Sequence, residues 1–527
     1  MYKNLSIKNS YLLTEAVDFH KKGFIDKAKE IYGKILKQDP ANTEVLKLSA
    51  IIEIQLNNYS QALNYINKSI KTNNTIAELY SIKGISLKNL KRYDEALSNF
   101  QKAIEIDRNF VDAYFNMSSV YQIKNELKKS LDNFYEVVKI DVNNYKAFSN
   151  IAFIKIKQRQ YNGALKDLEK AININPNYLN AYLLRGNVYK ELKNIEKSLS
   201  DYDKVLSVND INLNSLYYDA KFNKSQLLLS IQKFTEGWEL YESRFNLKNY
   251  YKQKIDSSKS KLNSLENLSD KTILVYGEQG IGDNIHFSRY LPLLRKKCKK
   301  IIFKVDNIMK GFFKSLNVVD KVCEFNEKDD KYDFYIYLMS LPFLFNTNIS
   351  NIPKNCINIS SEKDIEKKWS AVLEKYKNHY KIGIKWDVGN GIILDRSFSV
   401  NFFKKISGYK NCKLFSLEKN SDNKLKQKDL NILFFEDFDN LGLFSDSIAL
   451  IEKLDLIITC DTSIAHLAGT MKKNVWLILN DVSYWLWMQD IDYSPWYESI
   501  KIFRCKNRND WGPVFKEIEQ DLLNFMK

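Results

Sequence analysis

The chain has 527 residues, too many for a single hydrophobic core, and this length predicts two to four domains. Apolar residues make up 44% and charged residues 27% of the chain, an ordinary balance for a soluble globular protein. The formal charge of +16 comes mainly from Lys residues that alternate with Asp and Glu along the chain. Because nucleic-acid-binding proteins usually gather Arg and aromatic residues on one face, this class is disfavoured. A small anionic ligand remains compatible with the charge.

The chain carries no recognisable targeting or metal-binding pattern. Its N-terminus lacks the apolar core of a signal peptide, and no apolar stretch approaches the roughly 18 residues of a membrane span. The six Cys residues form no CxxC pair, and the four His residues are too scattered to complete a metal site. We therefore expect a soluble cytoplasmic protein with reduced, buried thiols and no metal.

A period of 34 residues runs through the first part of the chain. Blocks of 34 counted from Asn9 give six gapless copies that end at Asn212, and a seventh, imperfect copy follows Leu213 with about five extra residues. The twentieth position of every block is small, and the twenty-fourth is large. The eighth position is also small in every block and reads Ala16, Ala50, Gly84, Ser118, Ala152 and Gly186. Small residues at these spacings indicate paired helices that approach closely.

This pattern resembles that of tetratricopeptide-repeat proteins. The resemblance implies an all-α superhelix over residues 1–250, in which each helix pair buries its apolar face against its neighbours. It also implies a concave groove that holds a partner polypeptide. Asn116 and Asn150 share the sixth position of adjacent repeats, and in O-linked sugar transferases bearing such repeats an asparagine ladder holds the backbone of an extended polypeptide. In a chain so rich in Asn, chance is the alternative.

The composition changes after the repeats. Residues 251–270 are polar and rich in Lys and Ser, which suits a linker or cap, and residues 271–527 alternate between strand and helix patterns. Predicted strands cover 272–276, 300–305, 333–339, 381–386, 413–416, 454–460 and 475–479. A helical stretch over 361–380 separates two groups of strands. We therefore predict an α/β domain of two Rossmann-like halves, 271–365 and 375–527, with a cleft between them.

A glycine-rich turn, GEQGIGD, follows the first of these strands. Gly277, Gly280 and Gly282 fit neither the GxxxxGK nor the GxGxxG pattern, which disfavours a P-loop or a dinucleotide site. The turn still allows the backbone to approach a ligand closely. Asp283 ends the turn where a helix begins. It is therefore either a helix N-cap or a carboxylate at the cleft that accepts a proton from a hydroxyl group.

A second motif lies in LDLIITCDTSIAHLAG. A hydrophobic strand runs into Asp461, Thr462 and Ser463, where another helix begins. The free N–H groups and the positive end of that helix can hold a diphosphate, with the two hydroxyl groups as further donors. His466, on the first turn, can reach the same ligand. For this motif in isolation, an ordinary N-cap and a core histidine are the alternative.

Together, GEQGIGDNIHFSRYLPLL and DTSIAHLAG resemble bacterial tetratricopeptide-repeat proteins that bear a GT-B glycosyltransferase domain, related to the heptosyltransferase-like family. The blocks FTEGWELYESRF, DFYIYLMSLP, RSFSV and SPWYESIKIFR add to the resemblance, which covers nearly the whole chain. It implies a nucleotide-sugar in the C-terminal half, an acceptor facing the N-terminal half, and no metal or other cofactor.

The resemblance assigns a role to individual residues. Asp283, after the loop glycines Gly280 and Gly282, corresponds to the presumed general base. The diphosphate-binding motif corresponds to Asp461, Thr462, Ser463 and His466. Lys385 and Arg396 lie where they could neutralise phosphate charge, and solvated surface charges are the alternative for these two residues.

Three positions depart from the family pattern. The loop DVGNGIILDRS lacks the His usual there, Leu486 replaces an Arg, and Asn474 replaces a Pro. The leading hypothesis is a glycosyltransferase that moves a sugar from a nucleotide-sugar to a protein or surface-glycan acceptor recruited by the repeats. The rival is a non-catalytic repeat scaffold with a degenerate transferase domain. A dehydrogenase is disfavoured because the chain has no acidic residue in the expected place after a GxGxxG.

Overall fold

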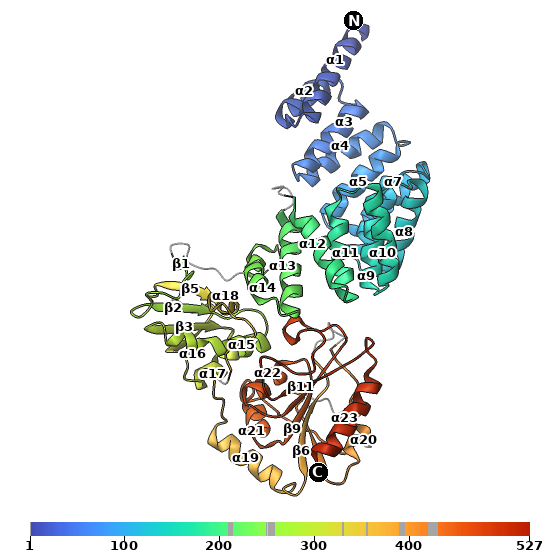
Figure 1. Cartoon of the computed structure of the whole chain (residues 1–527). Coiled ribbons are helices and arrows are strands. Elements are labelled where there is room, and N and C mark those ends of the chain that lie inside the picture. The colour runs from blue at the N-terminus through green and yellow to red at the C-terminus, as the bar shows by residue number, and fades with distance from the viewer. Residues whose placement is uncertain are drawn as a thin grey trace. The chain divides into compact units, whose positions relative to one another are not determined.

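The computed structural model describes residues 2–208, 214–248, 250, 259–328, 331–354, 357–388, 396–419 and 430–527. Their contacts divide the chain into two compact units, Met1–Val208 and Asn209–Lys527. The first unit is a stack of helix pairs, and the second combines one further helix pair with two sheets (Figure 1).

The first unit contains helices α1 to α12. Their bounds are Tyr2–Lys21, Ile25–Gln38, Thr43–Gln55, Tyr59–Thr72, Ala77–Asn89, Tyr93–Ile106, Val111–Ile123, Leu127–Ile140, Tyr145–Lys157, Tyr161–Ile174, Leu179–Glu191 and Ile195–Leu206. The first helices of the second to the sixth pair begin 34 residues apart, at Thr43, Ala77, Val111, Tyr145 and Leu179. The predicted period is therefore confirmed at the level of single helix boundaries.

The turn inside each helix pair repeats with the same spacing. A residue with a left-handed backbone follows the first helix of each pair, at Gly23, Asn57, Lys91, Asn125, Arg159 and Lys193. Such a residue ends a helix by turning the chain away from it, and Gly and Asn tolerate the conformation best. Lys and Arg occupy three of these positions, so the packing of the two helices holds the turn even where the residue does not favour it.

Close contact between the paired helices explains the small residues of the motif. A Cβ added at Gly84 would lie 2.5 Å from the Phe100 ring, and one at Gly186 would lie 2.8 Å from the Tyr202 ring. Ser198 Oγ donates a hydrogen bond to Gly186 O at 2.8 Å, which joins the twentieth position to the eighth. The large residue at the twenty-fourth position therefore fills the space that a small eighth residue leaves.

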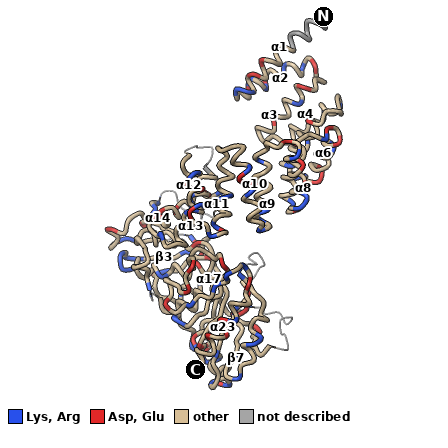
Figure 2. The backbone as a smooth tube through the Cα atoms, turned by 45° about the vertical axis from the view of Figure 1, so that its right-hand side comes forward, with Lys and Arg blue, Asp and Glu red and all other residues tan. Residues whose placement is uncertain are grey.

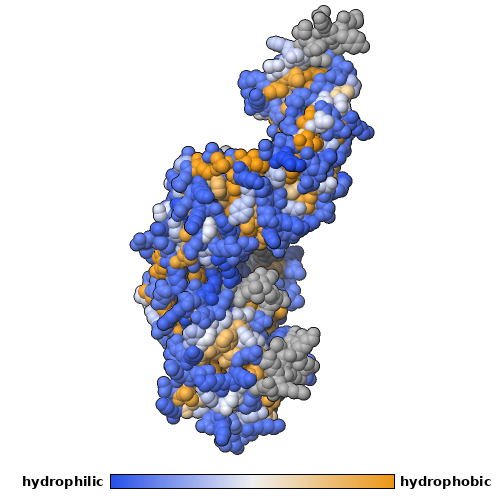
Figure 3. Space-filling model, turned by 90° about the vertical axis from the view of Figure 1, so that its right-hand side faces the viewer, coloured by the Kyte–Doolittle hydropathy of each residue, from blue (hydrophilic) through white to orange (hydrophobic). Residues whose placement is uncertain are grey.

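Lys and Arg residues are interspersed with Asp and Glu residues along the backbone (Figure 2). The face seen in Figure 3 is mainly hydrophilic, with separate apolar patches between the polar residues. None of the helices in the described ranges has the length and apolar character that crossing a membrane requires.

The seventh helix pair is α13 (Asn214–Ser230) and α14 (Phe234–Tyr241). Its left-handed turn residue, Gln232, follows Lys193 by 39 positions, which matches the expected insertion of about five residues in a period of 34. The sequence assigned this pair to a repeat domain ending at 250, whereas the contacts divide the chain before it. Aromatic packing explains this difference, because Trp238 makes ring contacts with Phe287 and Trp485 of the second unit.

The first sheet has the strand order β1-β5-β2-β3-β4, and its pairings are all parallel. Its strands β1 to β5 cover Ser260–Lys261, Thr272–Tyr276, Lys300–Val305, Lys321–Glu324 and Phe334–Tyr337. The helices α15 to α18 cover Ile281–Phe287, Leu291–Arg295, Asn307–Ser315 and Leu341–Leu344.

The second sheet has the order β11-β10-β9-β6-β7-β8 and is also parallel. Its strands β6 to β11 cover Tyr380–Lys385, Cys412–Ser416, Ile432–Leu433, Leu456–Cys460, Val475–Leu479 and Ile500–Arg504. The helices α19 to α23 cover Lys363–Glu374, Lys404–Ser407, Ser445–Lys453, Ser463–Thr470 and Trp511–Phe525. The two parallel sheets agree with the predicted α/β class.

The seven predicted strands all correspond to strands of the structure, with ends shifted by up to two residues. Strands β1, β4, β8 and β11 were not predicted. Strand β1 lies inside 251–270, the stretch predicted as a linker or cap, and residues 251–258 of that stretch lie outside the described residues. The five described Cys residues are buried and free, as expected, and Cys356 lies outside the described residues.

Candidate functional site

A cavity of about 630 Å³ opens at the carboxyl ends of the strands in the second sheet. Lys385 ends β6, Leu417 follows β7 and Asp461 follows β9, and all three line the cavity. Strands β6 and β9 are neighbours, and the chain continues outward from them in opposite directions. This is a topological switch point, where parallel α/β sheets leave a crevice for ligands.

The glycine-rich turn after β2 forms the opposite wall of this cavity through Gly280, Ile281 and Gly282. A Cβ added at Gly282 would lie 2.8 Å from His466 Cδ2 and 3.5 Å from Ser463 Cα, so the turn lies directly against α22. The structure therefore brings together the two motifs that the sequence singled out, although 180 residues separate them. Absence of a side chain at 282 is what allows this approach.

Asp283 lies at the start of α15, beside this contact. Its Oδ2 accepts a hydrogen bond from Gly280 N at 3.2 Å, and its Oδ1 accepts one from Tyr484 Oη at 3.2 Å. Burial raises the pKa of Asp283 to about 6, against the opposing effect of these hydrogen bonds. A carboxylate with this pKa is mostly ionised at neutral pH and is basic enough to take a proton from a hydroxyl group in a transition state. Asp283 therefore lies in the first turn of α15 and has a pKa suited to a general base.

Asp461 is buried and holds two neighbours in place. Its Oδ1 accepts a hydrogen bond from Trp487 Nε1 at 2.7 Å, and its Oδ2 lies 3.0 Å from Arg396 Nε. Arg396 also donates to the backbone oxygen of Asp461. Burial raises the pKa of Asp461, whereas Arg396 and Trp487 favour its charged form. The direct contacts of Asp461 are thus to protein groups, and its role toward phosphate stays a prediction.

Thr462 and Ser463 stand at the N-terminus of α22. Thr462 has an extended backbone, and no side chain caps the helix at this end. The Thr462 hydroxyl lies 3.3 Å from Thr459 Oγ1, and both residues of the pair 462–463 line the cavity. The first N–H groups of an eight-residue helix therefore point toward the cavity with their partial positive charge.

His466 is buried between α15 and α22. Its Nδ1 lies 3.0 Å from Tyr497 Oη, and the same hydroxyl lies 3.0 Å from His286 Nδ1. Its ring stacks on Trp487 with centroids 4.9 Å apart. Burial, with Arg289 and Arg396 nearby, lowers the pKa of His466 to about 3. The imidazole is therefore neutral at physiological pH and can offer a hydrogen bond but no positive charge.

Three cationic side chains line the cavity. Lys385 pairs with Glu418, and Lys419 donates to the backbone oxygen of Asp439 at 3.1 Å. Arg396, the third, is about one-third exposed. A smaller cavity of about 240 Å³ shares Arg396 and Asp461 with the first one and is lined by Tyr484 as well. The two cavities are therefore adjacent, and Tyr484, the hydrogen-bond partner of Asp283, lies next to the cationic side chains.

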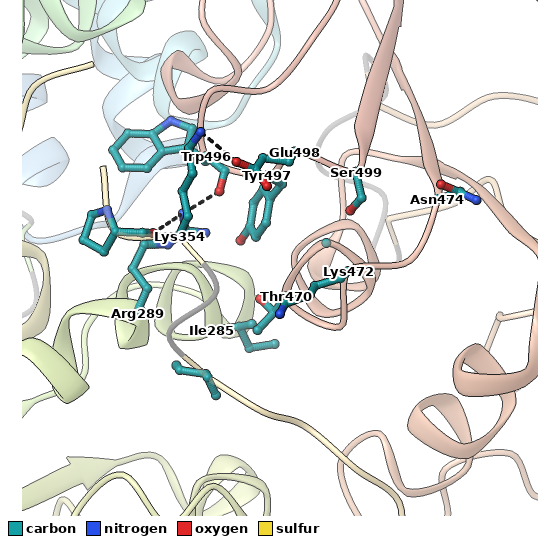
Figure 4. A pocket seen from close by; sticks show the side chains of 13 residues that line it. Ile285, Arg289, Lys354, Thr470, Lys472, Asn474, Trp496, Tyr497, Glu498 and Ser499 are labelled. Atoms are coloured by element: carbon teal, nitrogen blue, oxygen red, sulfur yellow. Dashed lines mark hydrogen bonds and ion pairs between the residues drawn. The ribbon is translucent and has the colours of Figure 1, made fainter. Parts of the chain in front are cut away.

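Another cavity, of about 320 Å³, lies at the opposite end of α22 (Figure 4). Thr470, the last residue of the helix, lines it together with Arg289 and Tyr497. Arg289 is directed toward the backbone of Trp496, to which it donates a hydrogen bond at 2.7 Å (Figure 4). None of the residues that the sequence assigned to the site lines this cavity. Its lining residues instead come from the halves of both sheets, with Arg289 from the first and Thr470 from the second.

The glycine-rich turn is also anchored to the seventh helix pair. Arg244, just after α14, has a fully buried side chain and donates to Glu278 at 3.1 and 2.9 Å, and to Ser340 Oγ at 2.8 Å. Glu278 in turn accepts a hydrogen bond from Met339 N at 2.8 Å. Because Glu278 belongs to the GEQGIGD turn, this ion pair fixes the position of the turn from outside the sheet.

The residues predicted to line a groove lie in the first unit. Asn116 Oδ1 accepts a hydrogen bond from Lys88 Nζ at 3.0 Å, and its Nδ2 donates to the backbone of Asp112. Asn150 Nδ2 donates to the backbone of Lys146 at 2.8 Å. Both amides therefore have partners within their own helices or the adjacent repeat, and contact with a polypeptide stays a prediction.

Sequence reasoning missed several residues that contact the site. Tyr484 holds Asp283, Tyr497 joins the two histidines, and Arg244 anchors the turn. Two of them had a signal, because Tyr497 lies in SPWYESIKIFR and Arg244 in FTEGWELYESRF. In the described part of the chain, no group of three or more His, Cys, Asp or Glu side chains is placed to hold a metal ion.

Comparison with known proteins decides the identity of the helix pairs. Residues 77–110, 154–193 and 179–212 match family models described as tetratricopeptide repeats or TPR repeats. The chain contains tetratricopeptide repeats. Such repeats are suited to protein–protein interaction, because stacked units present an extended surface. No curated protein matches the sequence significantly.

Several solved structures are similar to part of the chain. MamA is 24% identical, covering 30% of this chain and 93% of its own, with a TM-score of 0.28. The pilF protein of Pseudomonas aeruginosa is 16% identical over 39% of this chain and 93% of its own, with a TM-score of 0.36. YrrB, titled a TPR protein with an unusual peptide-binding site, is 19% identical over 33% of this chain and 91% of its own, with a TM-score of 0.28.

Proposed function

We propose that the second unit is a glycosyltransferase of the GT-B type, which moves a sugar from a nucleotide-sugar to the hydroxyl group of an acceptor. The observation that carries this proposal is the contact of Gly282 with α22, because the turn that ends in Asp283 thereby lies against the N-terminus of that helix, and Gly280, Gly282, Thr462 and Ser463 line one cavity. A base beside an anion-binding helix end is the combination that transfer from a nucleoside diphosphate needs.

In the proposed reaction Asp283 takes the proton of the acceptor hydroxyl group. The acceptor oxygen forms a bond to the anomeric carbon of the sugar, and the bond from that carbon to the diphosphate oxygen breaks. The nucleoside diphosphate leaves with the electron pair. Its added negative charge is stabilised by the N–H groups that open α22, by the hydroxyl of Ser463 and by Arg396. Asp461 holds Arg396 in position for this role.

Size and polarity of the cavity also support this proposal. A volume of about 630 Å³ lies within the usual range for small-molecule sites, roughly 300–1,000 Å³. Leu417, Leu443 and Phe444 give it apolar walls next to its cationic side chains. An apolar region beside a cationic one suits a ligand that joins a nucleobase to a diphosphate.

The tetratricopeptide repeats support a second part of the proposal, in which the first unit recruits the acceptor or a partner protein. The competing function is a scaffold that binds partners through the repeats and has lost transferase activity. The two functions differ in one measurable property, since only the first requires binding of a nucleoside diphosphate in the second unit.

Thermal unfolding of the full chain with UDP, GDP, ADP, CDP and TDP tests this difference. Binding of any of these ligands raises the unfolding temperature in proportion to its affinity and concentration. Arg396→Gln is expected to weaken the binding about tenfold through loss of a charged contact to phosphate. Lys405→Gln is the matched control, because Lys405 pairs with Glu519 on the surface. No shift with any of the five ligands would leave the scaffold function instead.

The role of Asp283 requires a second measurement. Mass spectrometry of the purified protein identifies a retained nucleotide-sugar, and release of the nucleoside diphosphate from that donor measures turnover. Asp283→Asn should lower turnover by about 10²–10⁴-fold, the usual contribution of a general base. Nucleotide affinity should stay nearly unchanged. An equal loss of binding and turnover would contradict the assignment of Asp283 as the base.

A further inference from the structure

The glycine-rich turn contains a strained residue that is not a glycine. Among residues 277–283, all of which the structure describes, only Gln279 has a left-handed backbone, with φ 60°. Gly280, next to it, has φ −82°. A left-handed backbone costs least at a glycine, and a residue with a larger side chain keeps it only where its surroundings hold it. We therefore expect the contacts of the Gln279 side chain to hold the turn.

Two tyrosine hydroxyl groups contact the Gln279 amide, one on each side. Gln279 Nε2 donates a hydrogen bond to Tyr241 Oη at 2.9 Å, and Tyr484 Oη lies 3.4 Å from Gln279 Oε1. Tyr484 Oη also lies 3.2 Å from Asp283 Oδ1. A continuous row of polar groups therefore runs from α14, through the turn, to the proposed base.

The seventh helix pair fixes the far end of this row. Tyr241, the last residue of α14, is 0% exposed, and its ring lies 5.9 Å from that of Trp238 and 5.5 Å from that of Trp485, between centroids. Trp485 directly follows Tyr484 in the chain. Because closely packed rings have little freedom to move, α14 holds both the partner of Gln279 and the segment that carries Tyr484.

The Tyr484 hydroxyl group has a single hydrogen but contacts two acceptors. It can donate that hydrogen to Asp283 Oδ1 or to Gln279 Oε1. An ionised carboxylate is the stronger acceptor, so Asp283 receives the hydrogen while it is charged. Once Asp283 is protonated, its own O–H can donate to Tyr484 Oη, and the hydrogen of Tyr484 becomes available to Gln279. Each protonation state of Asp283 therefore has its own set of hydrogen bonds.

We propose that Gln279 is a positioning residue for the base, which accepts the Tyr484 hydrogen whenever Asp283 holds the proton taken from the acceptor hydroxyl group. This inference rests on the proposed transferase function. In the protonated state Asp283 donates to Tyr484 and Tyr484 donates to Gln279, while Tyr241 keeps the amide in this orientation. Gln279 thus stabilises the state that proton transfer produces, and Asp283 becomes a stronger base.

The expected effect has a definite sign. Burial is the main cause of the raised pKa of Asp283, and the hydrogen bond from Tyr484 opposes it. A hydrogen bond that exists only in the protonated state favours the neutral carboxyl group, so Gln279 should raise the same pKa. Gln279 and Tyr484 should therefore act on Asp283 in opposite directions, although they contact each other.

Other titratable groups also surround Asp283, and they differ in charge. They are Arg396, Asp461, His466, Tyr241, Tyr484 and Tyr497. Arg396 lowers the pKa of Asp283, and Asp461 raises it. Burial raises the pKa of the three tyrosines and lowers that of His466, so all four are uncharged at neutral pH. Replacing Gln279 by an uncharged side chain alters none of these charges, and a shift in the pKa of Asp283 then reports on hydrogen bonding.

Carbon-13 NMR of the full chain, labelled at the Asp carboxyl carbons, measures the pKa of Asp283 directly. Its resonance is assigned by its absence from the Asp283→Asn variant. Gln279→Met removes the amide but keeps a side chain that is unbranched at Cβ, and it should lower the pKa of Asp283 by about half a unit. Gln232→Met is the matched control, because Gln232 is also exposed and left-handed, with φ 64°, in the turn between α13 and α14. In this control Asp283 should titrate as in the wild type.

A double variant tests whether Gln279 acts through Tyr484. Tyr484→Phe leaves Gln279 without a hydroxyl hydrogen to accept, so Gln279→Met should cause no further shift in that background. A pKa of Asp283 that is unchanged or raised in the single variant Gln279→Met would overturn the proposal. Equal shifts with and without the Tyr484 hydroxyl group would overturn it as well.

Turnover separates this inference from the proposed function. Release of a nucleoside diphosphate from the donor should show an acidic limb that moves to lower pH in Gln279→Met, by the same amount as the carboxyl pKa. If the carboxyl pKa shifts and the limb does not, the role of Asp283 as the base is wrong, and with it the part of Gln279 in catalysis. If Asp283→Asn abolishes turnover and Gln279→Met leaves the carboxyl pKa unchanged, the transferase proposal stands and the inference about Gln279 is overturned.

Discussion

Arg244 offers a direct test of how the glycine-rich turn is held. Its guanidinium is 0% exposed and donates to the buried Glu278, to Glu242 and to Ser340. Arg244→Met keeps an unbranched side chain at this position but removes the positive charge and its five hydrogen-bond donors. Glu278, which is 8% exposed, then loses its ion-pair partner.

The expected cost follows from this burial. Removing one partner of a buried ion pair typically costs about 3–5 kcal/mol, because the remaining charge stays away from water. Such a loss is a large part of the roughly 5–15 kcal/mol by which a domain is stable. Arg244→Met should therefore lower the stability of the second unit by about 3–5 kcal/mol and leave the first unit unchanged.

Tryptophan fluorescence separates the two units during urea unfolding. The chain has eight Trp residues, and the first of them along the sequence is Trp238, so all of them report on the second unit. Far-UV circular dichroism is weighted toward the helices of the first unit. Arg185→Met is the matched control, because Arg185 forms an ion pair with Asp201 inside the first unit at 2.8 Å. This control should shift the dichroism transition and spare the fluorescence transition.

The effect should also depend on pH. Burial disfavours the charge of Glu242, but Arg244 and Lys261 beside it outweigh this and hold its pKa below the ordinary 4.5. A depressed carboxyl pKa contributes stability above its unfolded value and loses it as pH falls through the folded value. The gap between wild type and Arg244→Met should therefore narrow below about pH 4.5. If the unfolding free energy from fluorescence at neutral pH stays within about 1 kcal/mol of the wild-type value, the anchoring role is refuted, because loss of a buried ion-pair partner should cost more than that.

Two further predictions concern the site itself. Gly282→Ala would place a Cβ 2.8 Å from His466 Cδ2, so the affinity for a nucleoside diphosphate should fall at least about tenfold. Gly280→Ala is the control and should lower the affinity much less, because its Cβ would have Asp283 Oδ2 as its nearest contact, at 3.3 Å. Equal affinities of the two variants in a binding titration would contradict the close approach of the turn to α22. Tyr484→Phe removes a hydrogen bond to the ionised carboxylate, so the pKa of Asp283, now about 6, should rise by about one unit. Turnover requires the ionised form of Asp283, so the acidic limb of the pH–turnover profile should move to higher pH while the plateau is retained. An unchanged acidic limb would show that the Tyr484 hydroxyl does not influence the base.

The repeat architecture could be predicted in detail because its contacts are local. Each helix pair packs against itself and its neighbours, so the spacing that the packing requires is written into consecutive residues. The pairing of Gly84 with Phe100, or of Gly186 with Tyr202, joins residues 16 positions apart. Single helix starts therefore follow the period through six copies.

The strands were predictable only where both faces are buried. Strands such as β2, β9 and β10 are apolar along almost their whole length. The four strands that the sequence did not reveal, β1, β4, β8 and β11, are the outermost strands of the two sheets in the described residues. An edge strand has fewer neighbours and leaves polar residues exposed, as Lys501 is in β11, so it lacks a continuous apolar run.

The sequence by itself determined the repeat period, the apolar central strands and the two polar motifs that follow β2 and β9. Only the tertiary structure decided which side chains meet them. Tyr484 reaches Asp283 across 201 positions, and Tyr497 reaches His286 across 211. Such contacts depend on how two separate sheets pack against each other and on the helix pair that precedes them. No local spacing of residues encodes that packing, whereas a repeat encodes its own.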